Sequence, residues 1–531
     1  MPRPWPLPIA LGLVLLSAFA NALAFPPFDL RPFAFVALVP LLLALRSGSV
    51  PRAIGLALLW AELSAWALAS VFPQSLADYY GRTPTFGFVL ASVLFVIMAG
   101  VYYAVFALVD RRLASRPSAF TPLLVAAAWV AVELARGRLF TGSTLFIGNP
   151  WGLQGYTHAT GVLAQVASIA GVYGIGFVLV SVNAGIAGLI GSWRAPADRS
   201  AAWRGVGVSF LPVAAAAGFG SLTLASAPEP RLEGDGHEIA VVQGNVSIDR
   251  RWRSDYYAKN LDVYLRLTDR ALRTGEPRLV IWPETSLNFF VEAEPRYRGA
   301  IMDTLRGSDA ALLAGGPSGE GDKSPPYFNS VFLIEAERGV TQRHDKELLV
   351  PFSEYVPLRS LDWMQRQIEG ARVFEAGPSS PPPLETPIGR VGVLICNEAM
   401  LPEVAADRVS AGAEILVSPS NDSWIRGRAF AEHMLAVVGL RAIEQRRFLV
   451  RASTAGPSAV VDPWGRVTAR TDVASPATMR GAVRPERGVT VYGRLGDAFA
   501  MGCVIAVAAA LVLPLVRPRL RAGRPGSAVT H

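Results

Sequence analysis

A cysteine at the end of an apolar, strand-like run is the residue in this sequence best placed to do chemistry. Cys396 follows the run 391–395, and the only other cysteine, Cys503, lies in an apolar stretch near the end of the chain. Cys396 is either a small apolar residue of a core strand or a nucleophile. A nucleophile requires a base and a cation that stabilises the developing negative charge. These groups must come from elsewhere in the chain.

The candidate base is Glu284, which follows the apolar run 279–282 and Pro283. Proline ends a strand and restricts the backbone just before the carboxylate. A carboxylate at the end of a strand is often simply solvated. If it is buried beside a thiol, its pKa rises and it can accept the thiol proton.

The candidate cation is Lys346, one of only three lysines among 50 basic residues. In a chain that otherwise uses arginine, a retained lysine suggests a need for a compact ammonium group. Such a group can hold an oxyanion and lower the pKa of a nearby thiol. The alternative is a surface ion pair with the adjacent Asp345 or Glu347. Glu354 is placed to orient Lys346 or to supply a second carboxylate.

Strand-like and helical patterns alternate around these three residues. Strands are predicted at 238–246, 279–282, 311–314, 329–335, 391–396, 414–418, 448–452 and 458–461. Helices are predicted at 256–273, 296–305, 402–411 and 429–445, with loops at 316–326 and 376–387. This is an α/β pattern long enough to enclose a substantial core.

The rest of the chain has the composition of a polytopic membrane protein. Of its 531 residues, 51% are hydrophobic and only 17% are charged. We predict eight spans, at 6–25, 30–45, 53–72, 86–108, 119–134, 162–190, 206–225 and 498–516. The first could instead be a signal peptide, since Ala20-Asn21-Ala22 resembles a cleavage site. The sixth contains Gly171-Val172-Tyr173-Gly174, which predicts a bend.

Arginines are distributed unevenly between the two ends of these spans. Thirteen lie on one side, at 3, 46, 52, 111, 112, 116, 194, 199, 204, 517, 519, 521 and 524. Four lie in the short loops of the other side, at 31, 82, 136 and 138. This bias predicts that both termini are cytoplasmic. The predicted units are a membrane domain (1–225), an exported catalytic domain (226–497), a final span (498–516) and a basic cytoplasmic tail (517–531).

The positive charge and the polar residues within the spans also need an interpretation. The net charge of +8 is not gathered into a basic stripe interleaved with aromatic residues, so we do not expect a nucleic-acid partner. Glu62, Glu133 and Asn183 fall within or near the spans. Such groups are either functional or paired with polar neighbours inside the bundle.

The order Glu284, Lys346, Cys396 resembles the catalytic set of the nitrilase, or carbon–nitrogen hydrolase, superfamily. Further motifs run along nearly the whole chain: Phe25-Pro26-Pro27-Phe28, Gly148-Asn149-Pro150-Trp151, Val242-Gln243-Gly244-Asn245, Trp282-Pro283-Glu284, the block 346–358, Asn421-Asp422-Ser423-Trp424 and Tyr492-Gly493-Arg494. With seven spans before the polar region and one after it, the chain resembles the apolipoprotein N-acyltransferase family. The resemblance implies a nitrilase-like α-β-β-α sandwich as the exported domain.

The resemblance also implies roles for individual residues. Glu284 would be the base, Lys346 the oxyanion-stabilising cation and Cys396 the nucleophile. The further positions on which the family's function depends, or that could contact substrate, are Trp252, Glu354, Asn397, Glu398 and Trp424. Asn397 stands where members commonly have tyrosine, so an aromatic role there is not expected. Trp252 and Trp424 could alternatively be core aromatics.

The implied activity is acyl transfer in two steps through a cysteine thioester. The donor would be a membrane phospholipid and the acceptor the α-amine of the diacylglyceryl-modified N-terminal cysteine of an apolipoprotein, with no metal or other cofactor. The location would be the bacterial inner membrane, with the catalytic domain in the periplasm. Apolar segments at 287–291 and 363–364 could form a lid over the site.

Two other functions remain open from the sequence. A membrane-tethered amidase or nitrilase would use the same three residues with water as the second nucleophile. A transporter or assembly factor would use the exported region only for binding, and Glu62 and Glu133 would favour it.

Overall fold

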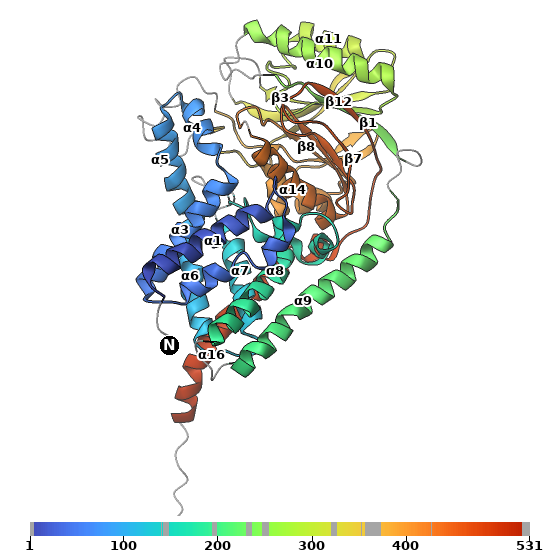
Figure 1. Cartoon of the computed structure of the whole chain (residues 1–531). Helices are drawn as coiled ribbons and strands as arrows, with labels where there is room; N and C mark the ends of the chain where they lie inside the picture. The colour runs from blue at the N-terminus through green and yellow to red at the C-terminus, as the bar shows by residue number, and fades with distance from the viewer. Residues whose placement is uncertain are drawn as a thin grey trace, which may run out of the picture.

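The computed structural model describes residues 5–139, 141, 148–193, 199–229, 236–246, 254–319, 326–351, 353–355, 373–425 and 427–522. Within them, a helical region precedes a region built on two β-sheets, and the last long helix returns to the helical region (Figure 1). The elements of the helical region are α1 (Leu7–Ala24), η1 (Arg31–Phe35), α2 (Val39–Leu45), α3 (Val50–Leu68), α4 (Phe72–Tyr80), α5 (Pro84–Phe95), the π-helical η2 (Val96–Gly100), α6 (Val101–Ala114), α7 (Thr121–Arg138), η3 (Gln154–His158), η4 (Leu163–Val166), α8 (Ala167–Ser192), α9 (Arg199–Ala225) and α16 (Ala498–Ala522).

The long helices agree in part with the predicted membrane spans. Four helical segments among the described residues are long and apolar enough to cross a membrane: Leu7–Ala24, Pro84–Ala114, Leu163–Ser192 and Arg199–Ala225. A fifth arises if α3 and α4, which are bent by 74° at their junction, form one broken span. The predicted spans at 30–45 and 498–516 correspond to shorter apolar helices, and α7 carries three charged residues in its second half. The number of eight spans therefore stays a prediction.

The predicted bend in the sixth span is confirmed. Gly171 has φ 62° and ψ −169°, which interrupts the helical backbone of α8. Most residues disfavour this region of φ, and a Cβ atom at this position would lie only 2.6 Å from the ring of Tyr492. Glycine is therefore required at this position both by the backbone and by the close packing of Tyr492.

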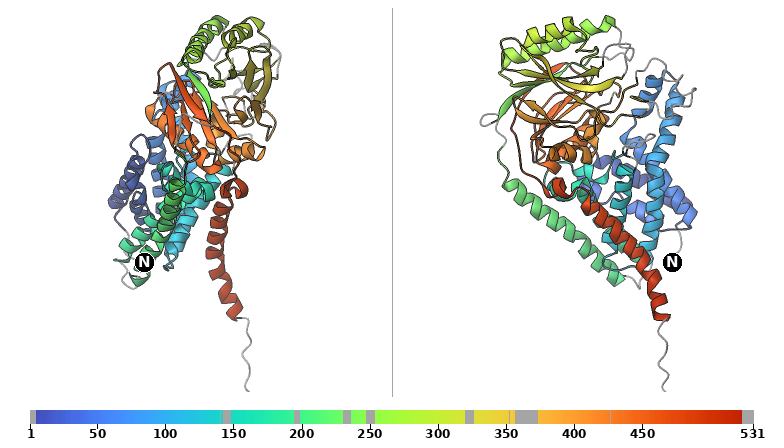
Figure 2. Two further views of the ribbon diagram at one scale, coloured as in Figure 1. Left: turned by 90° about the vertical axis from the view of Figure 1, so that its right-hand side faces the viewer. Right: turned by 180° about the vertical axis from the view of Figure 1, so that it is seen from behind.

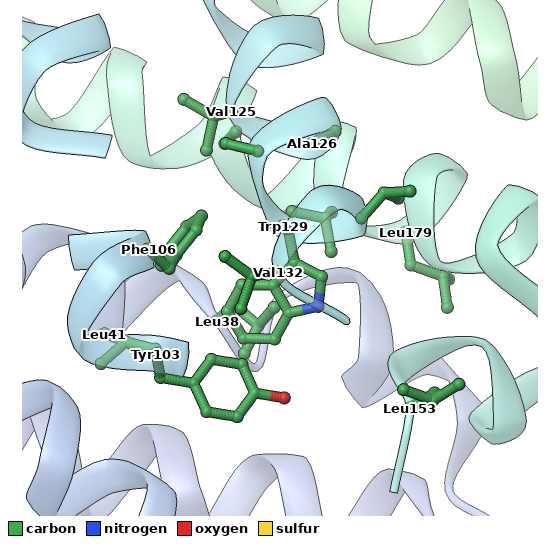
Figure 3. Packing of buried hydrophobic residues seen from close by; sticks show 14 of the residues in the cluster. Leu38, Leu41, Tyr103, Phe106, Val125, Ala126, Trp129, Val132, Leu153 and Leu179 are labelled. Carbon is green, nitrogen blue, oxygen red and sulfur yellow. The ribbon is translucent and has the colours of Figure 1, made fainter. Parts of the chain in front are cut away.

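Apolar side chains fill the centre of the helical region, and Tyr103, Phe106 and Trp129 lie among them (Figure 3). Trp129 packs against Trp60, Tyr103 and Phe106, with ring centroids 4.9–5.6 Å apart. Most of these rings meet edge to face, which is a favourable arrangement for aromatic pairs. This packing fixes α3, α6 and α7 relative to one another.

The polar residues predicted within the spans have partners. Asn183 Oδ1 accepts from the backbone N–H of Leu38, and its Nδ2 donates to the Ala34 carbonyl. Glu62 accepts from the indole of Trp66, and Glu133 accepts from the backbone N–H of Gln154. The interpretation that these groups are paired inside the bundle is therefore confirmed. It holds for the whole Asn183 amide and for one oxygen of each carboxylate.

The second region contains two six-stranded sheets, with orders β12-β1-β2-β3-β4-β5 and β11-β10-β9-β8-β7-β6. The strands are β1 (His237–Gln243), β2 (Leu279–Ile281), β3 (Ala311–Ser318), β4 (Phe328–Glu335), β5 (Gly339–Asp345), β6 (Leu384–Thr386), β7 (Gly389–Val393), β8 (Ile415–Ser420), β9 (Phe448–Ser453), β10 (Ala459–Val461), β11 (Val467–Arg470) and β12 (Ala477–Val483). The helices are α10 (Ser254–Thr274), α11 (Pro295–Leu305), η6 (Cys396–Met400), α13 (Pro402–Ser410), α14 (Arg428–Gln445) and α15 (Val491–Leu495).

Alternate residues of the strands build three apolar layers. In β1, Ile239 and Val241 point into the layer between the two sheets, whereas Ala240 and Val242 pack beneath α10 and α11. On the second sheet, residues such as Leu416 pack beneath α13 and α14. The result is the α-β-β-α sandwich that the resemblance implies (Figure 2). Because successive side chains of a strand point to opposite faces of the sheet, each strand contributes residues to two apolar layers.

All eight predicted strands and four predicted helices in this region are present, but β5, β6, β11 and β12 were not predicted. β5 and β11 have mostly partly exposed or exposed side chains, so they lack the apolar runs by which buried strands are recognised. The predicted loop at 376–387 contains β6, and the predicted loop at 316–326 begins inside β3.

Helix α14 joins the two regions. Its residues Val437, Leu440 and Ile443 belong to the same apolar cluster as the centre of the helical region. At one end, Phe430 stacks on Trp151 with ring centroids 4.8 Å apart. Further along, Glu444 accepts from the N–H of Val172, which follows the bend in α8. The two-sheet region is therefore docked on the helical region through a packed interface.

Candidate active site

The site lies where parallel strands of both sheets end. β2 leads to Glu284, β7 leads to Cys396, and β8 ends at Ser420. Parallel strands bring their carboxyl ends to the same edge of a sheet, and both sheets of the sandwich present that edge here. Cys396 has φ 54°, in the left-handed region, at the start of η6. This sharp turn is sparsely populated by non-glycine residues, and such positions cluster at functional sites.

Lys346 lies between two carboxylates. Its Nζ is 2.8 Å from Glu354 Oε2 and 3.5 Å from Glu284 Oε1. The Nδ2 of Asn329 donates to Glu284 Oε1 at 2.8 Å and to Glu354 Oε1 at 2.6 Å. The lysine side chain is only 1% exposed, so this is a buried network in which the ammonium and the amide together satisfy both carboxylates.

The thiol of Cys396 faces this network. Ser420 Oγ lies 3.8 Å from its Sγ. Burial raises the pKa of the Cys396 thiol, the Glu284 charge raises it further, and the Lys346 ammonium opposes the shift. Both effects favour the neutral thiol over the thiolate, because Cys396 is largely enclosed and lies beside a carboxylate.

Burial also shifts the pKa values of Glu284 and Lys346. Burial raises the pKa of the Glu284 carboxyl, while Lys346 and the hydrogen bond from Asn329 oppose this shift. For Lys346, burial alone would lower the pKa, but the carboxylates of Glu354 and Glu284 outweigh it and raise the pKa above its usual range. Lys346 is thus an ammonium group at neutral pH, and Glu284 is a carboxyl group whose proton affinity is higher than usual.

The structure brings together the three residues predicted to carry the chemistry, together with Glu354. It adds two groups that were not among the predicted site residues. Asn329, in β4, bridges the two carboxylates, and the backbone N–H of Asn421 donates to Glu284 Oε2 at 2.8 Å. The motif at 421–424 indicated the second of these, since it follows β8. Nothing in the sequence around Asn329 distinguished it from any other strand residue.

Glu398 and Asn397 hold the loop after Lys346 against the turn that carries Cys396. Glu398 is fully buried and accepts from the backbone N–H groups of Ile395, Glu347 and Leu348. Asn397 Nδ2 donates to the Leu348 carbonyl at 3.1 Å. Both side chains therefore fix the position of Lys346 relative to the Cys396 thiol. These hydrogen bonds form with asparagine at position 397 and do not depend on an aromatic ring there.

Comparison with known proteins places this site in a family. Residues 17–185 match the apolipoprotein N-acyltransferase N-terminal domain, and residues 238–487 match the carbon–nitrogen hydrolase family. A protein of Geobacter metallireducens named apolipoprotein N-acyltransferase is 32% identical to this chain, and the match covers 95% of each. The chain belongs to the apolipoprotein N-acyltransferase family.

A second relative agrees with this assignment. An apolipoprotein N-acyltransferase of Azotobacter vinelandii is 30% identical, and the match covers 97% of each chain. Among solved structures, an amidase from Nesterenkonia sp. AN1 of the nitrilase superfamily is similar with a TM-score of 0.38 and 19% identity, over 52% of this chain and 97% of the amidase.

In this member of the N-acyltransferase family, α4 of the helical region touches two loops of the site. The Tyr79 hydroxyl lies 2.9 Å from Ser353 Oγ, next to Glu354. Trp424, which is 41% exposed, packs edge-on against Phe72 and Tyr79. Trp424 is therefore not a core aromatic of the sandwich, and it lies at the boundary with the helical region. Trp252 lies outside the described residues.

The predicted lid is wrong in its first segment. Leu287, Phe289 and Val291 are fully buried in the layer beneath α10 and α11. Their apolar character comes from core packing, so this segment is not free to cover the site. The second segment, 363–364, lies outside the described residues.

The bridging role of Asn329 leads to a prediction for the pH dependence of this N-acyltransferase. Asn329→Ala removes donors that favour the charged form of Glu284, so the pKa of Glu284 should rise further. We expect the acidic limb of the kcat/KM profile to move to higher pH and activity at pH 7 to fall by roughly tenfold, as expected for loss of a hydrogen bond to a charged group. The measurement is the pH profile of acyl transfer.

Asn260→Ala is a suitable control, because Asn260 is a buried amide of α10 in the sandwich rather than in the carboxylate network. Its profile should overlay that of the unmodified protein. An acidic limb at an unchanged pH in Asn329→Ala would contradict the assignment of Glu284 as the titrating base.

Proposed function

We propose that this chain transfers an acyl chain from a membrane phospholipid, through a thioester on Cys396, to the α-amine of a diacylglyceryl-modified apolipoprotein. The observation that carries the proposal is the arrangement of Cys396, Glu284 and Lys346 in one buried site of a chain that belongs to the apolipoprotein N-acyltransferase family. The contact of two site loops with α4 supports a substrate that arrives from the membrane.

In the first step, Glu284 takes the thiol proton as Sγ attacks the ester carbonyl of the phospholipid. The raised pKa of Glu284 makes it a competent acceptor, and proton transfer during the attack avoids a free buried thiolate. Negative charge then develops on the carbonyl oxygen, where the Lys346 ammonium stabilises it. As the carbon–oxygen bond breaks, the leaving alkoxide recovers the proton from Glu284 and departs as a lysophospholipid.

In the second step, the α-amine of the acceptor attacks the thioester carbonyl. Glu284 accepts a proton from the amine, and Lys346 again stabilises the oxyanion. As the carbon–sulfur bond breaks, Glu284 returns this proton to the departing sulfur, which restores the thiol. An amide is much more stable than a thioester, so the transfer runs downhill without another energy source. Because the lysophospholipid product leaves before the second substrate reacts, ping-pong kinetics are expected.

We also propose the arrangement of the chain in the bacterial inner membrane. Residues 1–225 would form the membrane domain with seven crossings, 226–497 the periplasmic catalytic domain, 498–516 the final crossing and 517–531 the cytoplasmic tail. The arginine bias supports this orientation. The structure is compatible with it, because α9 and α16, which connect to the two-sheet region, both extend to the end of the helical region opposite the sheets (Figure 2).

The remaining predicted positions would act in substrate binding and support. Trp424, exposed beside α4, is placed to contact the acyl chains of either lipid substrate. Trp252 is proposed as a second contact. Glu354 would hold the ammonium of Lys346, and Glu398 and Asn397 would hold the loop that carries it.

The deciding experiment is to incubate purified protein with a phospholipid and a synthetic diacylated lipopeptide. Mass spectrometry should show one added acyl chain on the lipopeptide and an equal amount of lysophospholipid. Release of free fatty acid with no acylated peptide would instead indicate a hydrolase that uses water as the second nucleophile. Binding of the lipopeptide without any product would indicate a binding protein.

A further inference from the structure

A cavity lies among the helices at the end of the helical region opposite the sheets. Its volume is about 510 Å³, and it is lined by the ends of α2, α6 and α8 and the starts of α3, α7 and α9. Figure 1 shows that this end also carries the N-terminus and the far end of α16. The cavity is therefore remote from Cys396 and plays no part in the chemistry described above.

Arginines give this cavity an excess of positive charge. Arg46 lines it but is neutralised by the buried Asp110, whose carboxylate is 2.7 Å from its guanidinium. Arg111 also lines it and, within the described part of the chain, donates to the backbone carbonyls of Leu45 and Gly48 alone, at 2.7 and 2.8 Å. Among the described residues, Arg112 makes no ion pair, and no acidic residue lines the cavity. Two guanidinium charges are thus left without a carboxylate.

A further guanidinium lies beside the same turn. A Cβ atom built on Gly48 would lie 2.9 Å from Arg52 Cδ and 3.4 Å from its Nη1, so the Arg52 side chain packs against Gly48. The carbonyl of Gly48 is also the one that accepts from Arg111. The Nε and Nη2 of Arg52 are buried and have no hydrogen-bond partner in the described part of the chain. Buried donors of this kind normally have a partner, and the planar donors of a guanidinium suit an anion with several acceptor oxygens. Arg52 does not itself line the cavity.

The walls of the cavity above the arginines are apolar. Leu43, Leu108 and Ile190 are among the residues that line it, and Gly188 and Gly191 lie on the same part of α8 as Ile190. A Cβ atom at either glycine would meet nothing within 4 Å. This side of α8 therefore leaves an open, apolar slot between helices, of a kind that can accept a hydrocarbon chain.

We propose that this cavity binds one anionic phospholipid of the leaflet at this end of the helices, which is the cytoplasmic leaflet in the proposed topology. The phosphate would be held by Arg111 and Arg112 with Arg52 beside them, and an acyl chain would lie along Gly188. Arginine suits this role because its planar donors match phosphate oxygens. The apolar slot favours a lipid over free phosphate, and the two uncompensated charges favour an anionic headgroup over a zwitterionic one.

The test uses the full-length protein and native mass spectrometry with phosphatidylglycerol or phosphatidylcholine of the same chain lengths. We expect one phosphatidylglycerol to be retained in preference to phosphatidylcholine. Arg112→Gln should weaken its retention about fivefold, as expected for the loss of one basic residue near an anionic lipid. Gly188→Leu should fill the slot and weaken retention of either lipid by tenfold or more, while acyl transfer by the same sample shows that the variant is folded.

Arg116→Gln is the matched control, because Arg116 lies at the same end of α6 but does not line the cavity. It should retain phosphatidylglycerol as the unmodified protein does. Equal retention of the two lipids by the unmodified protein, or unchanged retention in Arg112→Gln, would overturn the proposal. Complete displacement of the lipid by millimolar inorganic phosphate would overturn it as well, since the site would then recognise the phosphate alone.

Discussion

Replacing Cys396 with serine is expected to abolish acyl transfer, with a loss in kcat of about 10⁴-fold or more, as found when a catalytic nucleophile is removed. A serine hydroxyl is far less acidic than a thiol, so Glu284 cannot deprotonate it effectively in this buried site. The change is nearly isosteric and retains the turn at φ 54°, so the fold should persist. The measurement is N-acylation of a diacylated lipopeptide, followed by mass spectrometry.

The same protein offers an internal control. Cys503 is buried in the helical bundle, and Cys503→Ala should retain nearly full activity. Incubation of the unmodified protein with phospholipid alone should add the mass of one acyl chain, which hydroxylamine removes because it cleaves thioesters. Cys396→Ser should show no such labile adduct. Full activity in Cys396→Ser, or an acyl adduct confined to Cys503, would rule out the proposed nucleophile.

Two of the three central residues could be placed from the sequence because buried parallel strands leave a clear signal. β2 and the second half of β7 belong to continuous apolar runs, at 279–282 and 391–395, and each run ends just before the residue of interest, Glu284 or Cys396. Lys346 had no such signal, since it follows β5, a polar strand at the edge of its sheet. It was singled out by the rarity of lysine and by the family resemblance rather than by an element that the pattern predicted.

The parts of the site that were missed depend on contacts between distant segments. Asn329 matters only because the antiparallel pairing of β3 and β4 brings its amide between Glu284 and Glu354. Likewise, the contact between α4 and Ser353 joins residues 274 positions apart. Local periodicity contains no information about either contact. The predicted lid failed for the related reason that an apolar loop segment and a buried core segment look alike in sequence.

Replacing Lys346 with methionine is expected to damage both catalysis and folding. Glu284 and Glu354 would then share a buried site with only Asn329 between them. Removing one partner of a buried ion pair typically costs about 3–5 kcal/mol of stability. Loss of an oxyanion-stabilising donor lowers kcat by about 10²–10³-fold. The loss here should be larger, because two neighbouring carboxylates without a cation favour protonation of one of them, which deprives Cys396 of its base.

A second substitution separates the two effects. Adding Glu354→Gln to Lys346→Met removes one of the two buried charges, so thermal unfolding should recover part of the lost stability. Acyl transfer should not recover, since the oxyanion still has no ammonium beside it. Lys259→Met, on the exposed face of α10, is the matched control and should change neither quantity. If Lys346→Met kept activity within tenfold of the unmodified protein, or if the double variant regained it together with stability, then Lys346 would only balance charge and another group would have to stabilise the oxyanion.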